Sequence, residues 1–122
     1  GLEDLVKDTR RVAERGSIRA IDKRQIYVDK EHKALNCLLQ GSAAVIAKRW
    51  LLITDDILRV NDCKHERYAF IHDEQVLGCL LEDAKSVSES CKMAALMAGE
   101  YYNLRLPIEA DAQIGDNWAE VH

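Results

Sequence analysis

Three consecutive ionisable residues, His72, Asp73 and Glu74, stand between two apolar runs at positions 68–71 and 76–81. Two β-rich runs that enclose a short polar segment are typical of a β-hairpin with the triplet at its turn. A carboxylate presented there can bind Mg²⁺, which prefers one or two carboxylates plus substrate phosphates and keeps several waters. One protruding aspartate therefore predicts half of a phosphoryl-transfer site. Taken alone, the triplet also fits a solvated turn, because aspartate is an ordinary turn residue.

Two further motifs accompany this triplet. Residues 35–44 read Leu-Asn-Cys-Leu-Leu-Gln-Gly-Ser-Ala-Ala, and residues 115–122 read Gly-Asp-Asn-Trp-Ala-Glu-Val-His. In chain order the three motifs resemble the minor-groove helix, the third palm motif and the closing Asn-Trp-x-x-x-His of family A DNA polymerases. The resemblance covers roughly residues 10–122 and is greatest to the bacteriophage branch of that family.

The resemblance implies a two-metal active site for template-dependent nucleotidyl transfer. Asp73 would be one of the two metal-binding aspartates, and Glu74 a weaker metal neighbour near the ions or the primer end. His72 would help to seat the primer terminus against the hairpin. Mg²⁺ would be the cofactor, and the partners would be primer-template DNA and deoxynucleoside triphosphates.

The rest of such an active site is not found in the sequence. No apolar strand ends in a second catalytic aspartate, and no helix carries the Arg, Lys and Tyr that hold the incoming nucleotide in the family. The adjacent pair Asp55 and Asp56 falls in a predicted helix where the family has no catalytic residue. We therefore expect the fingers and the first palm motif to lie in a remaining polymerase segment, and the isolated chain to be inactive. The chain would be either a cloned domain or one product of a split gene.

Asn36 and Gln40 are the candidate minor-groove residues. They are four positions apart on a predicted helix and so share one edge, which nearby alanines extend. Amides can donate to the purine N3 and pyrimidine O2 acceptors that every base pair presents in the minor groove. Without the resemblance they would be helix-surface amides, whereas the resemblance favours the DNA role.

Basic residues around a predicted hairpin turn are the candidate phosphate contacts. Arg19 and Arg24 lie on either side of this turn near Asp22, where a solvated basic turn is the equal alternative. His122 resembles the terminal histidine of the family, which folds back near the palm, and is assigned to the DNA-binding residues.

Composition sets limits on these roles. The 122-residue chain has a net charge of −4, which argues against a freestanding DNA binder with a broad basic surface. Four cysteines without a Cys-x-x-Cys pair indicate reduced thiols in the cytoplasm, with Cys37 and Cys91 as core residues. No run approaches the roughly 18 apolar residues of a membrane span, so we expect a soluble, intracellular protein without a membrane partner.

The hydrophobic pattern predicts one domain over residues 1–122. It comprises a helix at 2–14, a hairpin at 17–28, a long helix at 30–60, a hairpin around the triplet, a helix from 82–83 to about 103 and an edge strand at 104–114. This is an α+β fold, a partial polymerase palm with helices on one face of an antiparallel sheet. Its uncovered sheet surface would favour homo-oligomers of the fragment.

One alternative comes from a different functional class. The chain would then be a non-enzymatic nucleic-acid or protein-interaction module that has kept the palm fold. Binding by such a module would not depend on Mg²⁺, whereas the polymerase role predicts a metal-linked site at Asp73.

Overall fold

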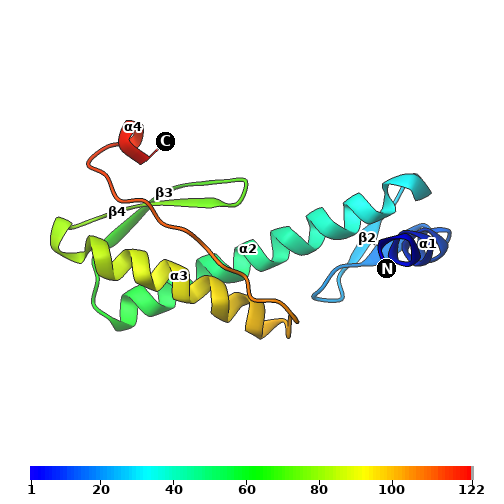
Figure 1. Cartoon of the computed structure of the whole chain (residues 1–122), viewed down its shortest axis with the longest axis horizontal. Helices are drawn as coiled ribbons and strands as arrows, with labels where there is room; N and C mark the ends of the chain where they lie inside the picture. Colours follow the sequence, from blue (N-terminus) through cyan, green and yellow to red (C-terminus); the bar gives the residue numbers. More distant parts are fainter. Residues whose placement is uncertain (122) are drawn as a thin grey trace. The chain divides into compact units, whose positions relative to one another are not determined.

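The structure is a computed structural model and describes residues 1–121 (Figure 1). The elements are α1 (Leu2–Ala13), β1 (Ser17–Arg19), β2 (Gln25–Tyr27), η1 (Glu31–Lys33), α2 (Ala34–Val60), β3 (His65–Ile71), β4 (Glu74–Cys79), η2 (Leu81–Asp83), α3 (Ala84–Tyr101) and α4 (Trp118–Val121). They fall into two compact units, residues 1–46 and 47–122, and α2 contributes to both. The prediction of one domain stays a prediction.

The first unit packs α1 and the β1–β2 hairpin around a small core. Acidic residues in the first turn of α1 and basic residues in its last turn both complement the helix dipole. Gly16 follows the helix with a φ of +80°, a conformation that glycine adopts without strain, and the chain then reverses into β1. Ala13, Ile18, Val28 and Ala34 form the buried cluster.

Gly41 lets the β1–β2 hairpin approach α2 closely. A Cβ atom at this position would overlap the Cδ1 atom of Ile26, whose side chain comes from β2. Glycine inside a helix costs about 1 kcal/mol relative to alanine. At position 41 glycine fits in spite of this cost, because any side chain there would require Ile26 to move.

The second unit combines the later part of α2 with α3 and the β3–β4 hairpin. Trp50 on α2 donates its indole N–H to the carbonyl of Cys91 on α3 at 2.8 Å. Three alanines of α3 are buried as well. Leu58 and Thr54 on α2 are fully buried, so the core of this unit lies on that side of the helix.

A bulge in β3 decides which side chains of the hairpin share a face. The strands pair antiparallel, with His65 opposite Cys79, Arg67 opposite Leu77 and Phe70 opposite Gln75. The register shifts between Arg67 and Ala69, so one extra residue, Tyr68, stands in β3. Directly paired residues share a face, and the face that carries Arg67 therefore continues through Phe70.

The predicted helices and both predicted hairpins are confirmed, and so is the α+β class. The two hairpins form separate two-stranded sheets. Asp83 is the cap residue of α3, but its side chain makes no capping hydrogen bond. All four cysteines are free, and burial raises the pKa of Cys91 to about 11.

The predicted edge strand at 104–114 is wrong, since the structure has no strand over these residues. The segment passes over α3 instead (Figure 1). A Cβ atom at Gly99 of α3 would lie 3.3 Å from the backbone nitrogen of Ile108. A strand needs a neighbouring strand for its backbone hydrogen bonds, and here the neighbour is a helix.

The expectation about membrane spans also needs correction. By length and composition alone, the helical segment Glu31–Val60 is apolar enough to cross a membrane. Core helices of soluble proteins have the same properties, so this finding alone carries little weight. Only 11% of its most apolar window is buried within residues 1–121, which leaves much of the helix surface uncovered.

Candidate active site

The ionisable triplet lies at the tip of the β3–β4 hairpin. Ile71 pairs with Glu74, so His72 and Asp73 form a two-residue turn. His72 has a φ of +55°, which costs a residue with a side chain about 1 kcal/mol and is common in tight hairpin turns. All three side chains are exposed. The turn therefore presents both carboxylates to solvent.

The chemistry of these donors fits part of a magnesium site. No side chain within residues 1–121 forms an ion pair with Asp73. Mg²⁺ takes hard oxygen ligands and completes its octahedron with water and substrate phosphate. The same residues contain no cluster of three or more His, Cys, Asp or Glu side chains that could hold a metal. A metal at Asp73 would therefore need further ligands from outside the described chain.

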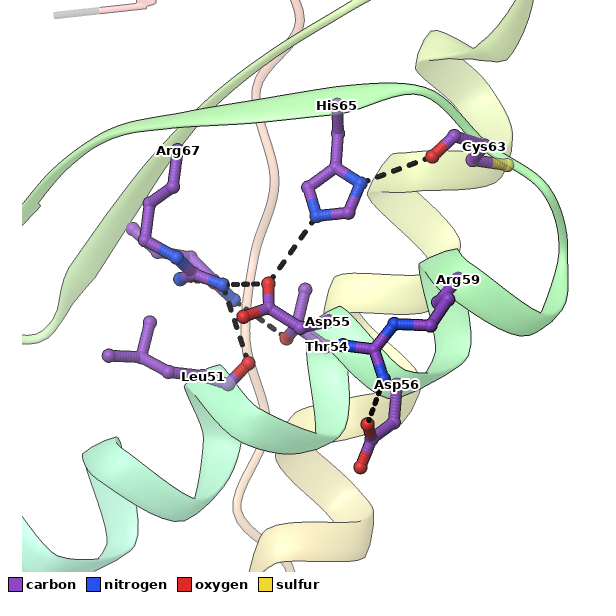
Figure 2. Close-up of polar contacts among 9 residues, drawn as sticks. Leu51, Thr54, Asp55, Asp56, Arg59, Cys63, His65 and Arg67 are labelled. Atoms are coloured by element: carbon purple, nitrogen blue, oxygen red, sulfur yellow. Dashed lines mark hydrogen bonds and ion pairs between the residues drawn. The ribbon is translucent and has the colours of Figure 1, made fainter.

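A polar network joins the hairpin to α2 (Figure 2). Arg67 on β3 forms an ion pair with Asp55 on α2 and donates to the Leu51 carbonyl at 3.3 Å. Its other terminal nitrogen donates to the side-chain oxygen of Gln75 on β4 at 2.8 Å. Gln75 in turn donates to the buried Thr54 hydroxyl at 3.1 Å.

His65 completes this network. Its Nε2 atom lies 3.4 Å from a carboxylate oxygen of Asp55, and its Nδ1 atom lies 3.1 Å from the Cys63 carbonyl oxygen. The sequence analysis predicts no role for His65, Arg67 or Gln75, and the structure places His65 at the start of β3. The spacing of His65 and Arg67 could have indicated that both side chains lie on one face of the hairpin, because residues two apart in a strand share a face.

The candidate minor-groove residues are both accessible. Asn36 and Gln40 are exposed on the same edge of α2, and Ala43 and Ala44 beside them are exposed as well. The structure assigns these four residues to the first unit and the triplet to the second. Each set presents its polar groups to solvent, as a DNA-contacting role requires.

The candidate phosphate contacts differ in their surroundings. Arg19 lines an open groove of about 610 Å³ in the first unit, together with the basic residues Arg15 and Lys23. Arg24 is exposed, but its Nε atom already lies 2.6 Å from a carboxylate oxygen of Asp22. Arg19 is therefore the better placed of the two predicted residues.

The closing motif builds a short helix. Asn117 accepts the Ala119 backbone N–H at 3.1 Å and donates to Glu120 at 2.7 Å, which caps α4. Glu120 also accepts the backbone N–H of Asp116 at 2.9 Å. His122 lies outside the described residues, so its assignment stays a prediction.

Comparison with known proteins identifies the family. Residues 6–120 match the family model for DNA polymerase family A. The DNA-directed DNA polymerase of Enterobacteria phage T3 is 36% identical over 112 residues, and that of Escherichia phage T7 is 34% identical over the same length. These alignments cover 86% of this chain and 16% of each phage protein.

A solved structure supports the fold. The POL domain of Pol1 from M. smegmatis, solved in complex with DNA primer-template and dNTP, superposes with a TM-score of 0.76 at 22% identity. The superposition covers 88% of this chain and 21% of that chain. The resemblance to the phage-type branch and the partial palm fold are both confirmed, and the chain belongs to DNA polymerase family A.

Proposed function

We propose that this chain is the carboxyl-terminal palm part of a DNA-directed DNA polymerase and supplies one metal-binding carboxylate to template-dependent nucleotidyl transfer. The observation that carries the proposal is the exposed Asp73 carboxylate at a two-residue turn, in a chain whose family is established. Because the chain spans 16% of its phage relatives, the remaining polymerase segments would complete the site.

The geometry of the hairpin supports the roles proposed for its residues. When bound there, Mg²⁺ supplies Lewis-acid stabilisation of the charge that develops on the reacting phosphate and the primer hydroxyl. The exposed Asp73 carboxylate would bind this ion at the turn, and Glu74 follows Asp73 as the first residue of β4. His72, the other turn residue, would contact the primer end and help to hold it beside the carboxylates.

Asn36 and Gln40 would read the primer-template minor groove without regard to sequence. Both amides can donate to acceptors common to all base pairs, and the exposed alanines beside them allow a duplex to approach. Arg19 would add a phosphate contact, as would Arg24 once it leaves Asp22. These few basic residues give local contacts, which suits a chain of net charge −4.

Alanine at Asn36 or Gln40 should weaken primer-template binding about five-fold each, since one hydrogen bond contributes about 1 kcal/mol. The loss should be equal for duplexes of different sequence. Fluorescence anisotropy with two unrelated primer-templates would measure it. Asn61→Ala, which removes another exposed amide near the end of α2, is the matched control. A loss confined to one duplex sequence, or equal to that of the control, would contradict minor-groove reading.

The central experiment compares the chain alone with the assembled polymerase. By assembled polymerase we mean this chain together with the segment that precedes the matched region in its relatives, supplied from the same source on one polypeptide or in trans. Primer extension with Mg²⁺ should occur only in the assembled polymerase. The isolated chain should give no product, because it lacks the second metal-binding aspartate.

Two results would decide against this proposal. If the assembled polymerase binds DNA equally well with and without Mg²⁺ and never extends a primer, the chain is a non-enzymatic module. If the chain alone extends a primer, the site is more complete than its own carboxylates indicate.

We also propose a cytoplasmic location, in the host cytoplasm if the source is viral. Self-association of the fragment is checked by its sedimentation.

A further inference from the structure

We propose that Asp55, Arg67 and Gln75 are positioning residues that fix where the β3–β4 turn holds Asp73. This inference rests on the proposed function. Arg67 acts through its contacts and does not reach the reacting atoms. Its guanidinium connects three separate backbone segments, namely α2, β3 and β4 (Figure 2).

The network holds both strands close to the turn. Gln75 directly follows Glu74 on β4, and it pairs across the hairpin with Phe70 on β3. Gln75 is tied to α2 through Thr54, and the Phe70 ring packs edge-to-face on Trp50 of α2, with ring centres 6.5 Å apart. The turn therefore begins one residue pair beyond two anchors on the same helix.

The Tyr68 bulge makes this double anchorage possible. In a regular strand, Arg67 and Phe70 would point to opposite faces, because three positions separate them. The extra residue places Arg67 and Phe70 on the same face, so the ion pair with Asp55 and the aromatic contact with Trp50 both join the hairpin to α2. Tyr68 itself covers the other side of the hairpin, where a Cβ atom at Gly78 would overlap its ring.

Directional contacts restrict the position of the β3–β4 hairpin more than apolar packing alone would. Dispersion contacts permit a strand to slide, whereas the planar fork of an arginine fixes the direction of each hydrogen bond. The Arg67 and Asp55 side chains are only 23% and 38% exposed, so water screens this pair less than a surface pair. A metal ligand must be held to within about 0.5 Å, which a tethered hairpin achieves.

The test uses the assembled polymerase carrying Asp55→Asn, Arg67→Lys or Gln75→Leu. Each variant should lower kcat about 10- to 100-fold and raise the Mg²⁺ concentration for half-maximal activity. The dNTP KM and the DNA Kd should stay within about three-fold, because no substrate contact is removed. Gln75→Glu keeps an acceptor for Arg67 and should restore kcat to within about three-fold of the parent. The kcat of the double variant Asp55→Asn/Arg67→Lys should be no lower than that of the less active of the two single variants.

Asp56→Asn is the matched control. This neighbouring aspartate is exposed and pairs with Arg59 on the same helix at 3.6 Å, away from the hairpin (Figure 2). The kcat of Asp56→Asn should equal that of the parent.

Hydrogen–deuterium exchange without metal gives a readout independent of activity. Amides of residues 72–76 should exchange at least about five-fold faster in Asp55→Asn than in Asp56→Asn.

Three outcomes separate this inference from the proposed function. If Asp55→Asn matches Asp56→Asn in kcat, Mg²⁺ dependence and exchange, while Asp73→Asn is inactive, only the positioning role is overturned. If the Asp55 and Arg67 variants lose DNA binding together with kcat, the network is merely structural and the inference is again overturned. If Asp73→Asn stays active, the proposed function itself fails.

Discussion

Replacing Asp73 with alanine is expected to abolish nucleotide addition by the assembled polymerase. The change removes the exposed carboxylate that the hairpin turn presents, and with it a ligand of the proposed magnesium site. A bound metal contributes several kcal/mol of charge stabilisation in the transition state, which corresponds to a loss of about 10³-fold or more. Single-turnover primer extension measures this loss directly.

Affinity for primer-template should change little in the same variant. Phosphate and groove contacts supply most of the binding free energy, so the Kd should stay within about three-fold. Asp111→Ala is the matched control, because it removes another exposed aspartate of the second unit outside the hairpin. Retained extension by Asp73→Ala, or an equal loss in Asp111→Ala, would refute the assignment of Asp73 as a metal ligand.

Leu58→Ala should destabilise the second unit by about 2–5 kcal/mol. Leu58 is fully buried, so the change creates a cavity and also loses the transfer free energy of the removed methyl and methylene groups. Urea denaturation of the 122-residue chain, followed by far-ultraviolet circular dichroism, measures the free energy of unfolding. A large loss would show that this unit has a specific core of its own.

Leu52→Ala provides the comparison on the same helix. Leu52 is 56% exposed, so its truncation removes little buried surface and should cost less than about 1 kcal/mol. Equal costs at the two positions would mean that the side of α2 bearing Leu58 is not the packed side. That result would also weaken the placement of the hairpin on this helix.

Local patterns were sufficient to predict most of the fold. The long helix follows from apolar residues at intervals of three and four, and the two hairpins follow from β-rich runs around polar turns. The exposed position of the triplet follows in the same way, since turn residues face solvent. These features depend on residues that are close together in the sequence.

The features that sequence reasoning missed depend on distant partners. Residues 104–114 have a strand-like composition, but the surface beside them is helix α3, so no ladder forms. The common face of Arg67 and Phe70 depends on the bulge, which changes the face of later residues without leaving a clear mark in the pattern. The low burial of α2 within residues 1–121 was likewise not indicated by its apolar pattern.

The bulge has a consequence for how this region can vary. Tyr68 is the one extra residue of β3, so the number of residues between Arg67 and Phe70 sets the face on which Phe70 lies. Deleting Tyr68 would leave Arg67 and Phe70 two positions apart and therefore still on one face, whereas inserting one codon between them would turn Phe70 to the opposite face and shift the acidic tip with it.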